Sequence, residues 1–161
     1  MRALSFDTHY AYLIALGYKD IENRSYNTQL GELLIHSTKK YKTDCITQYF
    51  PENSKIKKLW DMMLDKKFNP SDGEFKKLEN EYSKEIEIIK KDESMIYHNS
   101  AIIGCVTVQE CKQSDSEWAI EGQKHWKLIN PVLFDEPLKN VVGRQGIFNI
   151  ELPKSYDKYF V

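Results

Sequence analysis

The residues from Gly17 to Tyr26 form the most concentrated polar segment of this 161-residue chain. If the second half of the segment is extended, Glu22 and Arg24 project from one face, because side chains alternate along a strand. Lys19 lies within reach at the preceding turn. A guanidinium can hold a phosphate, a carboxylate can hold the polar edge of a base, and an ammonium can stabilise a developing negative charge. The three side chains therefore predict a polar binding or catalytic site.

The same spacing also fits a surface ion pair, which contributes about 0–1 kcal/mol, so spacing alone leaves both interpretations open. Composition narrows the choice of partner. The formal net charge is −1 and the isoelectric point is about 6.4. Coating duplex DNA requires many phosphates to be neutralised, and we expect no such binding. Any nucleic-acid role must use a local site.

Neither a metal, a cofactor nor a membrane is expected. Cys45, Cys105 and Cys111 contain no CxxC pair and have no second ligand at zinc spacing, so they are interpreted as reduced structural thiols. No apolar run approaches the roughly 20 residues that span a bilayer. Residues 1–7 lack the apolar stretch of a signal peptide. We expect a soluble, cytoplasmic protein.

The first third of the chain predicts the elements that position the polar segment. Residues 1–6 are typical of a strand and residues 8–16 of a helix, with Thr8 as its N-cap and Gly17 as the residue that stops it. Residues 22–26 are expected to be extended. Residues 33–36 are apolar and predict a buried strand.

The middle of the chain, residues 49–93, is rich in Lys and Glu and predicts a helical hairpin inserted into a β-rich domain. Two apolar stripes at helical spacing carry this prediction. Ser71 and Glu74 have the spacing of a capping box at the start of the second helix. Mixed charges predict a solvated face, with a partner-docking surface as the alternative.

The last third returns to strand character. Residues 101–108 and 147–152 predict strands, and residues 125–134 predict an extended run that Pro131 interrupts. The order of elements predicts one α+β domain over residues 1–161, a partly open barrel with a helix at one end.

Several stretches of the chain resemble the ASCH family, whose fold is similar to the PUA barrel. The N-terminal half has Gly17-x-Lys19-x-x-Glu22-x-Arg24 followed by a Gly-x-apolar-Ile-His strand that ends at His36. The C-terminal half has, in the same order as the family, Ala101-Ile102-Ile103-Gly104, Trp118, His125-Trp126-Lys127-Leu128, Pro137 and Gly143-x-Gln145-Gly146. The resemblance covers about residues 1–48 and 98–152 and leaves out the helical hairpin.

The resemblance implies an RNA-associated protein whose cleft is lined by Lys19, Glu22 and Arg24. Some short family members hydrolyse an acetylated cytidine with a Lys, a Thr and a Glu. Lys19 matches the Lys, but Glu22 stands where those members have the Thr, and a carboxylate cannot replace a hydroxyl nucleophile without a change of mechanism. Glu22 could instead act as a general base on water. Glu117 and Glu121 are candidates for the remaining acid.

Other candidate ligand-binding residues are spread along the chain. Tyr10 could supply the ring that family members provide with a Trp, and Ser25 directly follows Arg24. Trp118 could stack on a base or could close the barrel end. His36 could be a ligand contact or a hydrogen-bonded residue at the edge of the core. Gln145 belongs to the turn of residues 143–146, which could present backbone N–H groups to a ligand or could be a simple turn.

Three functions follow from these residues. The first is binding of RNA or a modified nucleoside. The second is hydrolysis, as a nucleoside amidohydrolase or a ribonuclease, with Lys19 and Glu22 as the catalytic pair. The third is interaction with a protein partner through residues 49–93. We expect Lys19 to be exposed, so Lys19→Ala should leave the melting temperature within a few degrees and change stability by less than about 0.5 kcal/mol. It should weaken ligand binding at least tenfold, about 1.4 kcal/mol.

Overall fold

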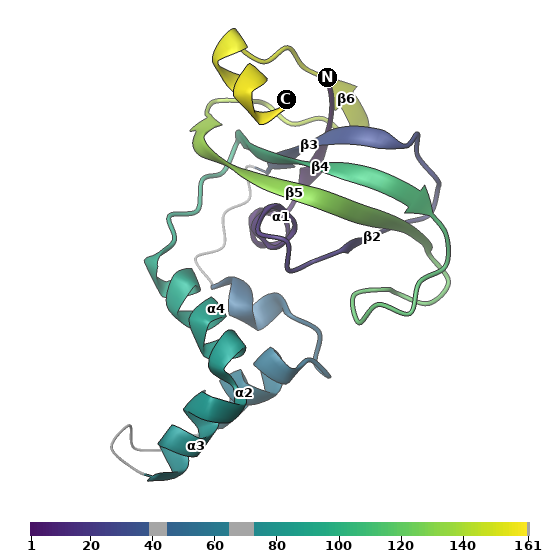
Figure 1. Ribbon diagram of the computed structural model, residues 1–161. Helices are drawn as coiled ribbons and strands as arrows, with labels where there is room; N and C mark the ends of the chain where they lie inside the picture. Colours follow the sequence, from purple (N-terminus) through teal and green to yellow (C-terminus); the bar gives the residue numbers. More distant parts are fainter. Residues whose placement is uncertain (39–44, 65–72, 161) are drawn as a thin grey trace. The chain divides into compact units, whose positions relative to one another are not determined.

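The computed structural model describes residues 1–38, 45–64 and 73–160 (Figure 1). The chain divides into two compact units. Residues 1–43 and 97–161 make up the first unit, and residues 44–96 make up the second. The first contains the sheet and the polar segment, and the second contains most of the helices.

A curled, six-stranded mixed sheet organises the first unit, as the predicted α+β class requires. Its strands are β1 Arg2–Phe6, β2 Ile21–Arg24, β3 Gly31–Ser37, β4 Ala101–Cys111, β5 Lys124–Leu138 and β6 Ile147–Asn149. Their order across the sheet is β2-β5-β4-β3-β1-β6. β1 and β3 are parallel, and every other neighbouring pair is antiparallel. The curl makes the sheet a half-barrel with β2 at one end of the strand order and β1 and β6 at the other (Figure 1).

Helix α1, Thr8–Ala15, packs on one face of the sheet against β1, β3, β4 and β5 (Figure 1). Leu13 and Ile14 are completely buried in this contact. Gly104 on β4 permits the close approach, because a Cβ at that position would collide with the backbone carbonyl of Val132 and would lie 3.4 Å from Cβ of Ala15. The structure thus has a helix on one face of the curled sheet, whereas the sequence predicts a helix at one end of a partly open barrel.

The opposite face of the sheet has a second apolar cluster. Ala3, Leu34 and Cys105 are aligned across β1, β3 and β4, so their side chains share one face. Since Gly104 faces α1, Cys105 points the other way. The C-terminal segment covers this face, and the ring of Phe134 stacks on that of Tyr159 with 4.3 Å between centroids.

The second unit is helical, with more elements than the expected two-helix hairpin. It contains a 3-10 helix at Ile46–Tyr49, then α2 Lys55–Leu64, α3 Gly73–Glu81 and α4 Ser83–Ser94. The buried carboxylate of Asp92 accepts hydrogen bonds from the backbone N–H groups of Ile46 and Thr47, at 3.1 and 2.9 Å. The predicted capping box cannot be placed, because Ser71 and the side chain of Glu74 lie outside the described residues.

Two local predictions were wrong. Asp7, not Thr8, occupies the N-cap position of α1, and the Thr8 hydroxyl instead accepts a hydrogen bond from Ser37 Oγ at 3.0 Å. Pro131 does not interrupt β5, because irregular register with β4 accommodates it within the strand. Among the described residues, no helix combines the length and apolar character needed to cross a membrane.

Candidate functional site

The end of α1 sets the direction of the polar segment. Gly17 adopts a φ of +83°, a conformation that glycine reaches without the cost of a Cβ. The N–H of Tyr18 bonds to the carbonyl of Leu13 at 2.9 Å, and the N–H of Gly17 bonds to that of Ile14 at 3.0 Å. This pair of bonds is a Schellman motif. It turns the chain so that Lys19 follows immediately and β2 begins two residues later.

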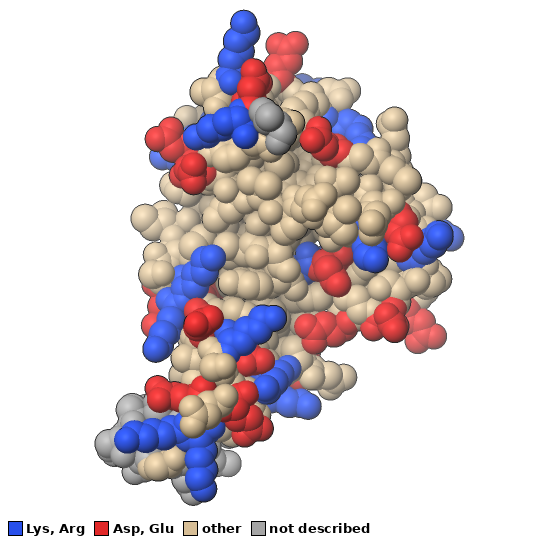
Figure 2. Space-filling view, in the orientation of Figure 1, with Lys and Arg blue, Asp and Glu red and all other residues tan. Residues whose placement is uncertain are grey.

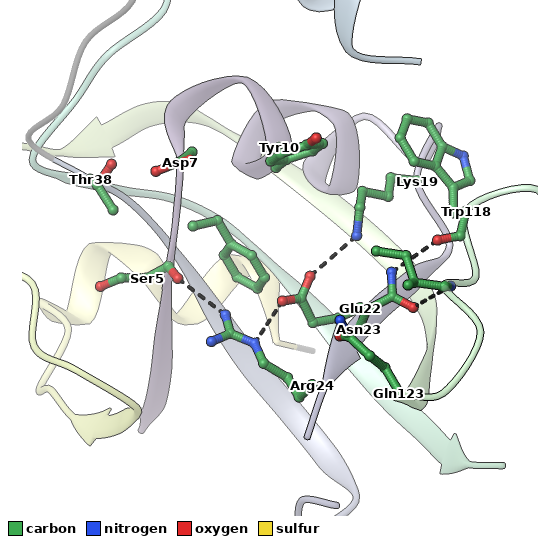
Figure 3. A pocket seen from close by; sticks show the side chains of 12 residues that line it. Ser5, Asp7, Tyr10, Lys19, Glu22, Asn23, Arg24, Thr38, Trp118 and Gln123 are labelled. Atoms are coloured by element: carbon green, nitrogen blue, oxygen red, sulfur yellow. Dashed lines mark hydrogen bonds and ion pairs between the residues drawn. The ribbon is translucent and has the colours of Figure 1, made fainter. Parts of the chain in front are cut away.

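The three predicted side chains meet around one carboxylate (Figure 3). Nζ of Lys19 lies 3.2 Å from Oε2 of Glu22, and Nε of Arg24 lies 2.7 Å from Oε1. Lys19 Nζ also donates to the backbone carbonyl of Ile21. Glu22 and Arg24 share a face of β2, as the alternation predicts. Both carboxylate oxygens are thus bonded to cations, which fixes the Glu22 carboxylate between them.

Lys19 is the most deeply buried of the three, with 6% of the residue exposed. Removal from water penalises an ammonium, so burial lowers the pKa of Lys19 below 10.5, and the neighbouring Glu22 carboxylate partly opposes that shift. The expectation of an exposed lysine was therefore wrong. The position resembles a buried, paired charge rather than a surface ion pair.

These side chains line a pocket of about 450 Å³ between β1 and β2, here named the β1–β2 pocket. The curl of the sheet brings the two strands together at this point, and Nη2 of Arg24 lies 3.5 Å from the carbonyl of Ser5 on β1. Residues from β1, α1, β2, the end of β3 and the 112–123 loop complete the lining: Ser5, Phe6, Asp7, Tyr10, Lys19, Glu22, Asn23, Arg24, Thr38, Trp118, Ile120 and Gln123.

Aromatic rings form much of the wall around the cations. Nζ of Lys19 lies 5.7 Å from the ring centroid of Tyr10 and 5.8 Å from that of Trp118. Both distances allow a cation–π interaction. Burial and the carboxylates of Asp7 and Glu22 raise the pKa of Tyr10, so its hydroxyl keeps its proton at neutral pH.

Hydrogen bonds attach the 112–123 loop to β2. Asn23 Nδ2 donates to the carbonyl of Trp118 at 2.9 Å, and Asn23 Oδ1 accepts from the N–H of Ile120 at 2.8 Å (Figure 3). The indole N–H of Trp118 donates to the carbonyl of Tyr18 at 2.9 Å. His125 also bonds to the carbonyl of Ile120, at 2.7 Å. Trp118 is consequently held in place by β2, through Asn23, and by the segment before β2, through Tyr18.

A second polar cluster lies next to the pocket. Nδ1 of His36 is 2.9 Å from Oγ of Ser5, and Nε2 is 2.8 Å from the carbonyl of Val141. Since a carbonyl only accepts, Nε2 carries the proton and Nδ1 accepts from the serine. Gly143 packs against this pair, and a Cβ there would lie 2.6 Å from Cε1 of His36. Burial lowers the pKa of His36 below 6.5, which favours the neutral ring.

The structure brings together five of the eight candidate residues: Lys19, Glu22, Arg24, Tyr10 and Trp118. The other three, His36, Ser25 and Gln145, are not part of the lining. His36 is 1% exposed and hydrogen-bonded at both nitrogens. Ser25 and Gln145 are exposed on the surface.

Sequence analysis missed seven of the lining residues, of which Ser5, Asp7, Asn23, Thr38 and Gln123 are polar (Figure 3). Asp7 and Thr38 directly follow β1 and β3, which are parallel, so both residues lie at the same edge of the sheet. Their positions after two predicted strands could have indicated this. Asn23 lies between two predicted residues, and its link to a distant loop left no local signal.

Cysteine and metal chemistry find no support in the described part of the chain. Burial raises the pKa of the Cys105 thiol to about 11, which keeps it protonated and unreactive. Within residues 1–38, 45–64 and 73–160, no group of three or more His, Cys, Asp or Glu side chains is arranged to hold a metal ion.

Comparison of the chain with protein-family models and with curated proteins gave no match. The case for a function therefore depends on the pocket and on the order of motifs in the sequence.

Proposed function

We propose that the β1–β2 pocket binds a nucleoside unit, either free or within RNA. The observation that carries the proposal is the convergence of Lys19, Glu22 and Arg24 beside the rings of Tyr10 and Trp118. Fixed donors and acceptors recognise the polar edge of a base, and aromatic rings offer a surface for its flat face. The pocket volume, about 450 Å³, lies within the range of about 300–1,000 Å³ usual for small-molecule sites.

The resemblance to ASCH domains supports the same conclusion. In this proposal the half-barrel is of the PUA-like type, the whole chain is one domain, and residues 49–93 are an accessory helical insertion. The surface fits a site of local rather than extended contact, because acidic and basic side chains are interspersed on the drawn face of each unit taken by itself (Figure 2). A duplex-binding protein requires a continuous basic band.

Calorimetric titration with nucleosides, nucleotides and a short single-stranded RNA tests the proposal. We expect at least one of these ligands to bind the parent protein and to bind Arg24→Gln at least tenfold more weakly. Ser25→Ala is the matched control, since Ser25 adjoins Arg24 but is exposed outside the pocket. No binding by any of the ligands, or equal loss in both variants, would contradict the proposal.

A second candidate function is hydrolysis of an amide on a nucleoside. Burial lowers the pKa of Lys19 below its ordinary value, and the Glu22 carboxylate lies 3.2 Å away. These are the properties expected of an acid–base pair. Incubation with N4-acetylcytidine and mass detection of cytidine and acetate tests it. Turnover that persists in Glu22→Gln would remove Glu22 from the reaction.

A further inference from the structure

The charged side chains that line the β1–β2 pocket cancel one another. Lys19 and Arg24 supply two positive charges, and Asp7 and Glu22 supply two negative charges. Both cations already contact Glu22, at 3.2 and 2.7 Å. A phosphate in the pocket would gain attraction from cations that are already compensated and would face two carboxylates. The electrostatics of the pocket favour an uncharged ligand.

The 112–123 loop adds negative charge next to the pocket lining, here called the rim. Glu117 and Glu121 are exposed and flank the lining residues Trp118 and Ile120, whereas Lys112 and Asp115 of the same loop line a different pocket. A nucleic-acid strand that entered the pocket would bring its phosphates past this loop. Like charges at an interface disfavour the wrong partner. The rim therefore favours a free nucleoside over a strand.

The hydrogen-bonding groups of the pocket specify a particular edge of the ligand. Glu22 can accept additional bonds, since each carboxylate oxygen has a second lone pair. Arg24 uses Nε for Glu22 and Nη2 for the carbonyl of Ser5, and Nη1 has no partner among the described residues. Lys19 Nζ uses two of its three N–H groups for the Ile21 carbonyl and for Glu22 Oε2, so one donor remains 3.2 Å from that acceptor. An adjacent N–H and C=O in a ligand complements that arrangement.

We propose that the ligand is an uncharged planar heterocycle with a cis-amide edge, of the uracil or 6-oxopurine type, and that it carries no phosphate. The inference rests on the proposed function. The ring N–H donates to Glu22 and the adjacent carbonyl accepts from Arg24 or Lys19. The flat face of the ring lies against Tyr10 and Trp118. Cytosine lacks the ring N–H and is a poorer match.

Calorimetry on the parent protein with matched ligands tests this inference without any variant. Uridine is compared with 3-methyluridine, and inosine with 1-methylinosine, because each methyl group replaces the N–H that would bond to Glu22. We expect at least one parent nucleoside to bind at least tenfold more tightly than its methylated partner and than cytidine. Uridine 5′-monophosphate and a short oligouridylate are expected to bind no more tightly than uridine.

The possible outcomes separate this inference from the proposed function. If the monophosphate or the oligouridylate binds tenfold more tightly than uridine, the pocket accepts phosphates and the inference fails while the proposed function stands. If neither methylated nucleoside binds more weakly than its unmethylated parent, the cis-amide edge is not recognised. The inference then fails while the proposed function stands. If no nucleoside, nucleotide or RNA binds, the proposed function itself fails.

Discussion

Two polar clusters both contact Ser5 of β1, and they differ in how completely their hydrogen bonds are satisfied. In the first, His36 bonds to Ser5 through one ring nitrogen and to the Val141 carbonyl through the other. In the second, Lys19 and Arg24 converge on Glu22 at the wall of a pocket. The histidine has no bonding capacity left, whereas the arginine has donors to spare.

The comparison separates structural polar groups from ligand-facing ones. A buried ring with both nitrogens bonded stabilises the fold and offers nothing to a ligand. The Glu22 carboxylate lies between two cations, but it keeps surplus lone pairs, and both Glu22 and Arg24 line the pocket. Burial alone does not distinguish the two clusters, because His36 is 1% exposed and Lys19 is 6% exposed.

The largest effect is expected from Glu22→Leu. Removing the carboxylate leaves the buried ammonium of Lys19 without its partner, which costs about 3–5 kcal/mol in comparable sites. Urea denaturation measures the change in the free energy of unfolding. The double variant Lys19→Met/Glu22→Leu is the control, and it should recover most of the loss, because the deeply buried ammonium is gone and the Arg24 side chain, which is 28% exposed, can still reach water. A loss below about 1 kcal/mol in the single variant would contradict the buried-pair description.

His36→Ala should cost somewhat less, about 2–3 kcal/mol. It removes both bonds and leaves the Val141 carbonyl and the Ser5 hydroxyl without their partner. Gly143→Ala should also destabilise the protein, because the added Cβ would collide with the His36 ring. Neither change should alter the affinity of the remaining folded protein for a pocket ligand. Altered affinity would show that the two clusters are coupled.

The stability of the protein should also decrease on acidification below pH 6.5. Burial lowers the pKa of His36 in the folded state, so the unfolded chain binds more protons between the two pKa values. The unfolded state is therefore stabilised relative to the folded state as the pH falls through that window. The slope contributed by His36 is at most about 1.4 kcal/mol per pH unit. Comparing His36→Ala with the parent protein from pH 7 to pH 5 isolates this contribution, which the variant should lack.

Lys19→Met should have the smallest effect on stability, within about 1.5 kcal/mol, although Lys19 is buried. Methionine fills a similar volume without a charge, and Arg24 remains as a partner for Glu22. Ligand affinity should nevertheless fall at least tenfold. In the parent protein the folded-state pKa of Lys19 is lowered, so its contribution to stability should improve as the pH rises toward 10.5. That improvement should be missing from the variant.

Local patterns in the sequence predicted the parts of the site that are close together along the chain. Alternation along a strand placed Glu22 and Arg24 on one face, and Gly17 correctly marked the end of α1. Apolar periodicity predicted the helix that packs on one face of the sheet. These features depend on interactions within a few residues, and the sequence carries them directly.

Features that depend on distant segments were not predicted. The burial of Lys19 involves Trp118, whose indole N–H bonds to a carbonyl 100 residues earlier in the chain. The same limitation applies to Asn23, which bonds to the 112–123 loop. Thr8 looked like an N-cap, but Ser37 on a neighbouring strand engages its hydroxyl instead. Each error arose where a tertiary contact competed with a local preference.

The two walls of the pocket are synthesised far apart in time, since Asn23 and its partner Trp118 are separated by 95 positions. A nascent chain has no complete pocket until the ribosome has passed the loop that carries Trp118. Occupancy of the pocket would then be a property only of folded chains that include this loop. A ligand that binds only these molecules would favour them over incomplete or unfolded chains, by about 2.7 kcal/mol at a hundred times its dissociation constant.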